Sequence, residues 1–366
     1  MNFNIERNEI LPSLQAVCGV IDRRQALPIL SNLLIVVKKG KIIFTGTDME
    51  VEMVTEINHP SESQGEITIP ARKLLDICRA LPDDANINLS FKKDQVLVKS
   101  GKSKFTLATL PATEYPSTEA LSSSNKISLP QEELKALLED TMFSMAQQDV
   151  RYYLNGLLLE LDKNSLRAVA TDGHRLALKE INVKTGIEEA QQIIIPRKGV
   201  IELIRLLDGD DKNVSIEVSQ NHIRVSKEKL QFTSKLIDGK FPDYQRVIPK
   251  EGAHPIKTDR ETLKQGLIRA SILSNEKYKG IRLVLQHNLL KAFAHNPEQE
   301  EAEEEIEINY KGDDIEIGFN VTYLLDALST IKTQEVILNI SDPNSSCLIL
   351  PDDESECKYV VMPMRL

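Results

Sequence analysis

The sequence predicts an α+β protein built from three repeated domains, each with two helices packed on antiparallel sheets. Amphipathic helical patterns recur near residues 7–21, 130–146 and 259–275, and an apolar, strand-like stretch follows each of them. The length agrees, because 366 residues are too many for one ordinary core. Polar linkers place the domains at 1–124, 125–250 and 251–366.

Two sets of equivalent positions give the repeat a fixed length. A turn recurs at Asp48, Asp172 and Asn296, at intervals of 124 residues. The last strand of each unit begins near Phe105, Phe232 and Tyr359, at intervals of 127 residues. Such spacing is hard to produce by chance, so a single α+β enzyme with coincidental periodicity is the less favoured interpretation.

A second helix is expected in each unit. The first two open alike, with Pro70-Ala71-Arg72-Lys73 and Pro196-Arg197-Lys198, and proline suits a first helical turn because its missing N–H would be unpaired there. The third opening, near Asn320, lacks the basic pair. Equivalent helices of a repeat face equivalent directions, so the basic pairs share one surface that could meet DNA phosphates. Solvated helix starts are the alternative.

The net charge of −10 alone argues against a nucleic-acid partner. The acidity belongs almost wholly to the third unit, with 12 basic and 21 acidic residues, and is densest at 298–305. Such a run is usually a solvated face. Lys99, Lys102 and Lys104 in the first unit are a possible complement, and a head-to-tail dimer would set them against this run.

Several classes of protein lack support in the sequence. The N-terminus has no signal peptide, and no apolar run is long enough for a membrane helix. The four cysteines show no metal-binding spacing, which indicates reduced thiols in a cytoplasmic protein without a metal or cofactor.

The strongest enzyme hypothesis uses Asp172 and His174 as an orienting carboxylate and a base. No nucleophile motif, P-loop or zinc motif accompanies them, and the contiguous acidic run fits an interface better than a nuclease site. A pocket-rim or structural histidine is therefore favoured. A third hypothesis is an acidic scaffold that never touches DNA, but such a protein would not need paired basic helix starts.

Five stretches together resemble the bacterial sliding clamp family, the β subunit of DNA polymerase III. They are Thr171-Asp172-Gly173-His174-Arg175-Leu176, Pro196-Arg197-Lys198-Gly199-Val200-Ile201-Glu202-Leu203, Phe241-Pro242-Asp243-Tyr244, Asn296-Pro297-Glu298-Gln299-Glu300-Glu301-Ala302 and Val360-Val361-Met362-Pro363-Met364-Arg365-Leu366. The resemblance covers the whole chain in order.

This resemblance implies a DNA clamp fold with six domains per dimeric ring. It implies a non-catalytic processivity factor of DNA replication that encircles and slides on duplex DNA without reading its sequence. The implied partners are a second copy, DNA polymerase III α and other polymerases, the clamp loader, and repair and replication-initiation factors that carry a clamp-binding peptide.

The resemblance also implies site residues. Those for the DNA backbone are Arg24, Arg72, Lys73, Gln148, Tyr152, Tyr153, Arg197, Lys198, Lys279 and Arg282. Those for a hydrophobic peptide-binding pocket are Leu154, Thr171, Gly173, His174, Arg175, Leu176, Pro242, Arg246, Val247, Tyr278, Asn320, Tyr323, Ser346, Val360, Val361, Met362, Pro363, Met364 and Arg365.

Two further expectations concern the dimer interface and the chain end. Phe105 and Leu107 should pack near Ile272 and Leu273 of the second copy, and Lys102 and Lys104 should face Glu300, Glu301, Glu303 and Glu304. The apolar end at 362–366 is unlike a frayed tail, so we expect it to be docked as one wall of the pocket.

Overall fold

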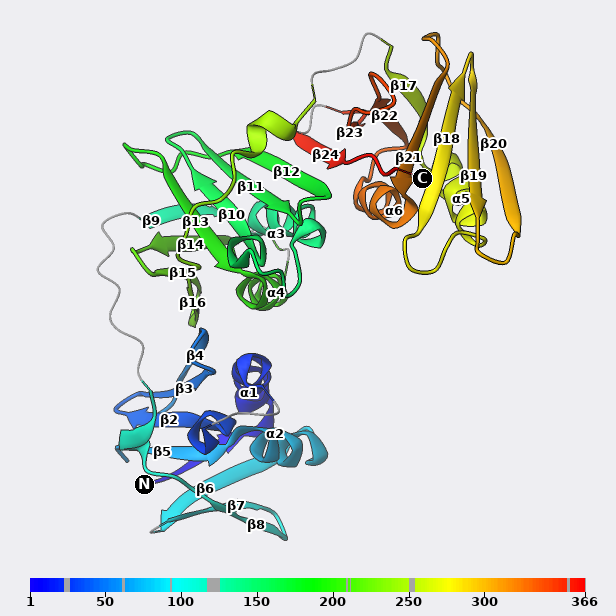
Figure 1. Cartoon of the computed structure of the whole chain (residues 1–366). Coiled ribbons are helices and arrows are strands. Elements are labelled where there is room, and N and C mark those ends of the chain that lie inside the picture. Colours follow the sequence, from blue (N-terminus) through cyan, green and yellow to red (C-terminus); the bar gives the residue numbers. More distant parts are fainter. Residues whose placement is uncertain are drawn as a thin grey trace. The chain divides into compact units, whose positions relative to one another are not determined.

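The structure is a computed structural model of the chain (Figure 1). It describes residues 1–22, 27–60, 63–92, 94–116, 126–208, 210, 212–249, 254–353 and 356–365. Both predicted domain boundaries, 124/125 and 250/251, lie outside the described residues, so the domain limits stay a prediction.

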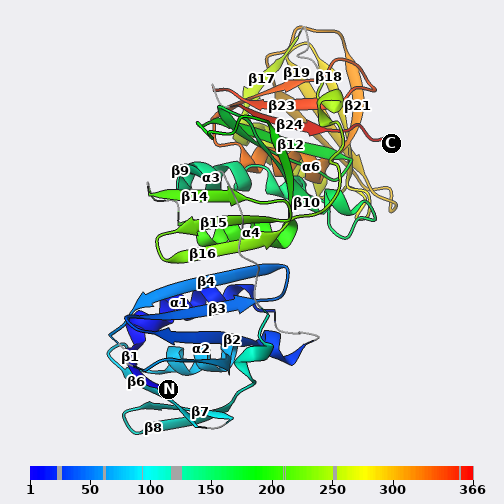
Figure 2. The same cartoon turned by 90° about the vertical axis from the view of Figure 1, so that its left-hand side faces the viewer.

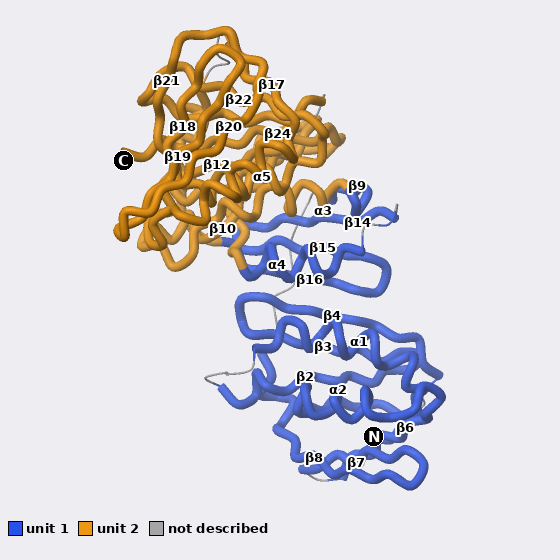
Figure 3. Tube along the Cα trace, turned by 90° about the vertical axis from the view of Figure 1, so that its right-hand side faces the viewer, with its two compact units in different colours: residues 1–132, 198–236 blue, residues 133–197, 237–366 orange. Residues whose placement is uncertain are grey.

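The chain forms two compact units (Figure 3). The first contains residues 1–132 and 198–236, and the second contains residues 133–197 and 237–366. The division passes through the predicted middle domain, because each half of that domain shares a sheet with one neighbouring repeat.

Six α-helices lie in the described part of the chain, two in each predicted repeat. The first helices of the repeats are α1 (Arg7–Val20), α3 (Gln131–Glu139) and α5 (Arg260–Ser271), and the second are α2 (Ala71–Ala80), α4 (Arg197–Leu206) and α6 (Val321–Thr330). The expected helix near 130–146 is shorter than predicted. Thr141, with φ −122°, leaves the α-helical conformation, and a 3₁₀ turn follows at Met142–Ser144.

The first unit holds two antiparallel sheets. One has the order β1-β6-β7-β8, with β1 Asn2–Glu6, β6 Asn86–Lys92, β7 Gln95–Ser100 and β8 Ser103–Ala108. The other has the order β5-β2-β3-β4-β16-β15-β14-β9, with β5 Gly65–Pro70, β2 Asn32–Lys38, β3 Lys41–Thr47, β4 Val51–Asn58, β16 Leu230–Lys235, β15 His222–Lys227, β14 Asn213–Val218 and β9 Lys126–Pro130. Figure 2 shows β4 beside β16, where the first and second repeats join.

The second unit is organised in the same way. Its eight-stranded sheet has the order β13-β10-β11-β12-β24-β23-β22-β17, with β13 Gln191–Pro196, β10 Gly156–Leu161, β11 Ser165–Thr171, β12 Arg175–Asn182, β24 Cys357–Val361, β23 Cys347–Pro351, β22 Glu335–Asn339 and β17 Ile256–Asp259. Its four-stranded sheet has the order β20-β19-β18-β21, with β20 Glu301–Glu307, β19 Leu289–His295, β18 Gly280–Gln286 and β21 Ile315–Asn320.

The two long sheets join the repeats in one register. Phe232 of β16 lies opposite Met53 of β4, and Tyr359 of β24 lies opposite Ala177 of β12. Phe232 and Tyr359, two of the three predicted last-strand aromatics, are both buried. The third, Phe105 of β8, is only half-buried, and β8 is an edge strand of its sheet.

One strand in each repeat was not predicted. β1, β9 and β17 each precede the first helix, so every repeat begins with a strand rather than a helix. In β1 the side chains of Phe3 and Ile5 are buried and their neighbours are exposed. This two-residue alternation was the signal that sequence reasoning missed.

Aliphatic residues fill the cores, as expected of a chain without tryptophan. All four cysteines lie among the described residues, where they form no disulfide and are buried. Burial raises the pKa of Cys18 and of Cys78 to about 12. Among the described residues, no helix has the length and apolar character needed to cross a membrane.

Candidate functional site

The turn at 171–175, between β11 and β12, is fixed by its own side chains. The Asp172 carboxylate accepts hydrogen bonds from the N–H groups of His174 and Arg175, at 2.9 and 3.0 Å. The Thr171 hydroxyl donates to the Arg175 carbonyl at 2.6 Å. Gly173 has a φ of +89°, which favours glycine at this position. The turn therefore presents His174 outward while Arg175 points inward.

The first repeat has the same turn. Asp48 accepts from the N–H groups of Glu50 and Val51, and the Thr47 hydroxyl donates to the Val51 carbonyl at 2.8 Å. In the third repeat the turn is one residue longer, since His295 pairs with Glu301 where Thr171 pairs with Leu176. The recurrent turn predicted from the sequence is thus conserved in two repeats and extended in the third.

Arg175 ties this turn to α6 of the same unit. Its guanidinium group pairs with Asp172 and with Asp326 of α6, and donates to the Phe143 carbonyl at 2.9 Å. It also lies over the Tyr323 ring, 4.7 Å from the centroid. With its side chain only 14% exposed, Arg175 acts chiefly as a structural link between the turn and α6.

The His174 ring lies parallel to the Tyr323 ring, with centroids 6.4 Å apart and 16° between the planes. Asp172 accepts from the backbone N–H of His174 and pairs with Arg175. The carboxylate therefore does not orient the imidazole as a catalytic base would require. The geometry gives His174 the role of a surface aromatic.

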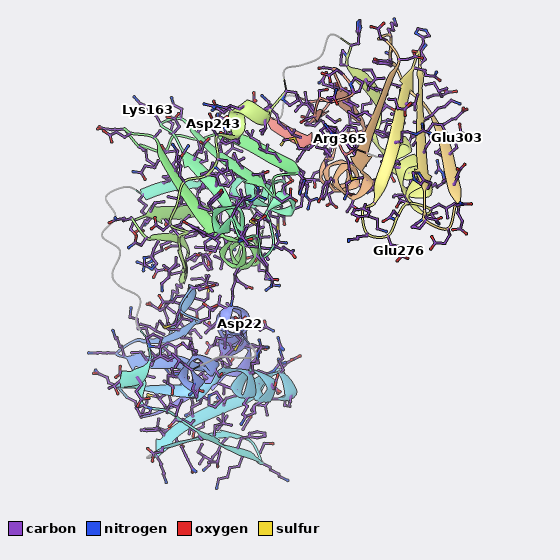
Figure 4. The ribbon with its side chains drawn as sticks, viewed as in Figure 1. Asp22, Lys163, Asp243, Glu276, Glu303 and Arg365 are labelled. Carbon is purple, nitrogen blue, oxygen red and sulfur yellow. The ribbon has the colours of Figure 1, made fainter. Side chains whose placement is uncertain are left out.

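The end of the chain is docked, as predicted. The Met362 N–H donates to the His174 carbonyl at 2.9 Å, and the Met364 N–H donates to the Gly318 carbonyl at 2.7 Å. The Ser346 hydroxyl lies 3.0 Å from the Met362 sulfur. Figure 4 labels Arg365, which follows this anchored segment. Leu366 lies outside the described residues.

An apolar cluster lies beneath these groups. It contains Leu154, Leu176 and Val360, three of the residues expected at the peptide site, together with Phe241 and Tyr244. Pro242, Arg246 and Val247 belong to the same segment as Tyr244 and are exposed. The structure thus places the apolar cluster and these exposed residues together in the second unit.

Three residues that support the segment around Tyr244 were not identified from the sequence, namely Glu160, Arg167 and Glu180. The Tyr244 hydroxyl donates to Glu160 at 2.6 Å, and Arg167 donates to the Tyr244 hydroxyl at 3.1 Å. Arg167 also pairs with Glu160 and with Glu180. Alternating charge on β10, β11 and β12 was the available signal, but cross-strand register is needed to place these groups together.

The remaining residues expected at the peptide site lie at two other places in this unit. Asn320 caps α6, and its side chain accepts from the Thr322 N–H. Tyr278, in the segment after α5, is 57% exposed and carries the Lys277 ammonium group over its ring. The Lys279 carbonyl accepts from the Val321 N–H, so this segment contacts the start of α6.

Some of the expected DNA-contacting residues lie in the first unit. Arg72 and Lys73 are exposed on the first turn of α2, and Arg72 donates to the Ile21 carbonyl at 2.9 Å. Lys198 pairs with Asp22 and Asp48. Burial alone would lower the pKa of Lys198, but these two carboxylates hold it above its usual value. Arg24 lies outside the described residues.

The others lie in the second unit. Tyr152 and Tyr153 pack edge to face at 5.8 Å, close in sequence to exposed Gln148. Arg197 opens α4 and donates to the Met145 carbonyl at 3.2 Å, and burial lowers its pKa. Lys279 is half-buried.

Arg282 has a different setting. Ile281 and Leu283 point into the helix-covered core, so Arg282 points to the opposite face of β18. There it pairs with Glu316 and lies over the Phe293 ring. It therefore does not share a surface with α5 and α6.

Most of the residues expected at the dimer interface lie on or beside β8 and β20, which are edge strands of their sheets in the described part of the chain. Lys102, Lys104, Phe105 and Leu107 belong to β8 or the turn before it. The acidic residues Glu301, Glu303 and Glu304 belong to β20, and Glu300 precedes it. Figure 4 labels Glu303 on this strand. Leu273 is half-buried, and Ile272, after α5, is 73% exposed.

Glu304 differs from its neighbours on β20. Its carboxylate pairs with Arg269 of α5, on the helix-covered face of the sheet. Glu303 pairs with Lys291 at 3.3 Å on the opposite face. Glu303, rather than Glu304, is thus on the face where alternation places Glu301 and Glu305.

Three family models together match nearly the whole length of the chain. They describe the N-terminal domain of the DNA polymerase III beta subunit at residues 1–119, the central domain at 128–243 and the C-terminal domain at 245–365.

Curated relatives and solved structures agree. The chain is 53% identical to the beta sliding clamp of Pseudomonas putida and 47% identical to that of Escherichia coli, in both cases over 100% of either chain. A crystal structure of the DNA polymerase sliding clamp from Pseudomonas aeruginosa matches with a TM-score of 0.98 and 50% identity, and the Caulobacter crescentus pol III beta structure matches with 0.96 and 36%; both alignments cover 100% of each chain.

Proposed function

Because this chain belongs to the DNA polymerase III beta subunit family, the bacterial beta sliding clamps, we propose that it closes around duplex DNA with a second copy of itself. The chain is a processivity factor of DNA replication and is not an enzyme. The assembly, the residues that meet DNA and the residues that bind partners belong to the proposal, as does action in the bacterial cytoplasm.

The single observation that carries the proposal is the pattern of sheet edges. Within the chain, β4 joins β16 and β12 joins β24, and each junction makes one eight-stranded sheet from two repeats. β20 is the counterpart of β4 and β12, and β8 is the counterpart of β16 and β24. β20 and β8 are each an edge strand of a four-stranded sheet. Pairing β20 with β8 of a second copy would complete a third eight-stranded sheet and remove both edges.

The repeat also supplies a register for this pairing. Phe105 precedes Phe232 by the 127 residues that separate Phe232 from Tyr359. Phe232 faces Met53, and Tyr359 faces Ala177. With the one-residue extension of the third turn, the counterpart of these two partners is Ala302.

The same register sets charges of opposite sign against each other. Phe105 would face Ala302 of the partner subunit, and Lys104 would face Glu303 of the partner subunit. A cross-strand pair of opposite charge stabilises a sheet by roughly 0.2–1 kcal/mol, so these residues would select the register more than they would add affinity.

For DNA, we propose that phosphates contact the exposed basic groups on the first turn of α2, the half-buried basic groups on the first turn of α4 and the aromatic groups near Tyr152. Such contacts position a protein on the duplex without reading its sequence, which suits a ring that slides. Lys198 is already paired with two carboxylates, so its contribution depends on phosphate competing with Asp22 and Asp48.

For partners, we propose that polymerases, the clamp loader and repair and initiation factors present a short peptide to the surface around His174, Tyr323 and the docked chain end. The apolar cluster with Leu176 and Val360 would take the apolar anchors of that peptide. Each buried anchor would contribute roughly 1.5–3 kcal/mol before entropic costs.

Topological retention tests the ring. After loading, the protein should stay on nicked circular DNA and be lost from the same DNA once it is made linear. Equal retention on both forms would contradict encirclement. Replacing Ile272 and Leu273 together with serine should give monomers of 41.2 kDa in sedimentation and abolish retention on circles. A mass that stays at twice that value would place the interface elsewhere.

A further inference from the structure

The first unit contains a cavity of about 560 Å³ that no part of the proposed function uses. Residues of α1, β4, α4 and the β15–β16 turn line it, including Ala16, Gly19, Met53, Thr55 and Glu202. Figure 3 shows α1 and α4 in the same unit. The space is open because the first repeat lacks an ion pair that the other two repeats place there.

In the second repeat, the equivalent place holds an ion pair. Lys179 of β12 pairs with Asp140, which follows α3, and the two side chains are 16% and 12% exposed. Asp140 comes nine residues after the first residue of its helix, and its N–H still bonds the Ala136 carbonyl. A cation therefore lies between the helix and the strand.

In the third repeat, an ion pair of reversed polarity holds the same place. Arg269 also comes nine residues after the first residue of its helix, and it pairs with Glu304 of β20 at 3.1 Å. Strand register makes Glu304 the counterpart of Lys179, since they face Ala292 and Ala168 respectively. Here the helix supplies the cation.

In the first repeat, neither position of this ion pair holds a charged residue. Ala16 stands where the helix carries Asp140 and Arg269, and Thr55 stands where the strand carries Lys179 and Glu304. Thr55 is 5% exposed, and its hydroxyl has no hydrogen-bond partner among the residues that the structure describes. A buried polar group without a partner is unfavourable, so the cavity wall presents a hydroxyl that a ligand could hydrogen-bond.

A carboxylate also lines this cavity. Glu202 of α4 is 7% exposed, and a Cβ atom added at Gly19 would lie 3.5 Å from its Oε2 atom. Its Oε1 atom accepts from Arg205, whose side chain is 66% exposed. Burial raises the pKa of Glu202, against the opposing charges of Arg205 and Lys198. The small residues Ala16 and Gly19, three positions apart on one face of α1, leave the space around it open.

We propose that this cavity binds an alkylammonium or alkylguanidinium group, whose charge would meet Glu202 and whose N–H would reach the Thr55 hydroxyl. The ligand would take the place that the Lys179 ammonium and the Arg269 guanidinium occupy in the sister repeats. Its aliphatic stem would lie against the apolar part of the lining, which includes Met53 and Leu206. A lysine or arginine side chain of another protein and a free small amine share this chemistry.

Ligand-observed NMR on the full-length protein tests the proposal with n-butylguanidine and its neutral isostere n-butylurea. The cation should bind at least about tenfold more tightly, because the urea loses the charge-assisted hydrogen bond. Glu202→Gln should remove that preference, and Thr55→Val should weaken binding of the cation. Glu217→Gln, a carboxylate of the same unit outside the cavity lining, is the matched control and should change nothing.

A second variant fills the cavity. Ala16→Asp with Thr55→Lys rebuilds the ion pair of the second repeat, so it should abolish binding of n-butylguanidine while the protein stays folded. An arginine-containing tripeptide that binds as well as n-butylguanidine would identify a protein side chain as the source, and binding of the free guanidine alone would identify a small molecule. Equal binding of the urea, or no binding of either probe to the wild-type protein, would overturn the proposal and leave the cavity to water.

Discussion

The main-chain N–H of Met362 donates a hydrogen bond of 2.9 Å to the carbonyl oxygen of His174. This bond continues the pairing of β12 with β24 beyond Val361, where the strands end. Residues far apart in the sequence thereby form one continuous surface. The same surface holds Tyr323, because Arg175 links the turn to α6.

Because its thiols are buried, the native protein should not react with thiol-alkylating reagents. Burial raises the pKa of Cys18, Cys78 and Cys347 to about 12, against an ordinary value of 9.0. At pH 8 we expect no alkylation by iodoacetamide until the protein is unfolded, when all four cysteines should react. Mass spectrometry would count the modified thiols. Rapid labelling of one cysteine in native protein would contradict its burial.

The same shift gives stability a pH dependence. Above pH 9 an unfolded thiol loses its proton while the folded thiol keeps it, so the unfolded state is favoured as pH rises from 9 towards 12. Each such thiol should lower the free energy of unfolding by about 1.4 kcal/mol per pH unit in that window. Cys347→Ala should reduce the slope of stability against pH, measured by urea unfolding.

Reversing charges across the proposed subunit junction should weaken the dimer and then restore it. Lys104→Glu would set like charges against Glu303 of the partner subunit, and Glu303→Lys would do the same from the other side. Each single change should raise the dimer dissociation constant by roughly three- to tenfold, and the double reversal should recover it.

Sedimentation equilibrium at low and high salt checks this register. The differences should shrink in 0.5 M salt, because exposed charges are screened. Lys38→Glu, on β2 in the interior of the other sheet of the same unit, is the control and should leave association unchanged. If the double reversal is no better than either single change, Lys104 and Glu303 do not face each other.

Charge reversal on the helix starts should weaken contact with duplex DNA regardless of its sequence. Arg24, Arg72 and Arg197 are the first set to change to glutamate. Exposed Lys73 is the simplest single change, because Arg72 and Arg197 donate to backbone carbonyls whereas the Lys73 side chain makes no such bond within the described part of the chain. Each lost phosphate contact should reduce the slope of log affinity against log salt by roughly 0.9.

Binding measured at several salt concentrations gives that slope. Lys163→Glu, at the exposed turn between β10 and β11, is the control for net charge and should leave the slope as it is. The thermal stability of the Arg72 and Arg197 variants should be measured beside their DNA binding, because both side chains also donate hydrogen bonds to backbone carbonyls. An unchanged slope in a folded Lys73→Glu protein would remove α2 from the DNA surface.

Periodicity predicted the repeats because each repeat must bury the same pattern of apolar residues. The strands beside Asp48 and Asp172 pair in the same register, Thr47 with Glu52 and Thr171 with Leu176. Phe232 and Tyr359 likewise pair with equivalent residues, Met53 and Ala177. Partners of charged side chains were less predictable. That Lys198 meets Asp48, and that Arg167 meets Tyr244, depends on packing between segments 150 and 77 residues apart.

The peptide site stays a prediction. Residues in the turn at 171–175 and in the chain end were assigned to it because contiguous stretches that resemble the family carry them. Phe143 and Asp326, which hold Arg175 in place, belong to stretches without a distinctive pattern. The cavity beside Ala16 and Thr55 could be recognised only from the strand register, which shows that the second and third repeats have ion pairs at the equivalent positions.

Removing the chain end should abolish partner binding without breaking the proposed dimer. Deleting residues 362–366 removes both backbone hydrogen bonds of the docked end, from Met362 to His174 and from Met364 to Gly318. The edge strands β8 and β20 make no hydrogen bond with this segment in the described part of the chain. The deletion therefore takes away one wall of the peptide site and leaves the sheet edges intact.

Calorimetry with a clamp-motif peptide, together with sedimentation, separates the possible results. We expect the truncated protein to lose peptide binding and to keep twice the mass of the 41.2 kDa chain. Ser346→Ala is the milder comparison, since it removes only the contact of the hydroxyl with the Met362 sulfur and should weaken binding less than the deletion does. Normal peptide binding after truncation would exclude the chain end from the site, whereas conversion to monomers would show that the docked end supports the ring.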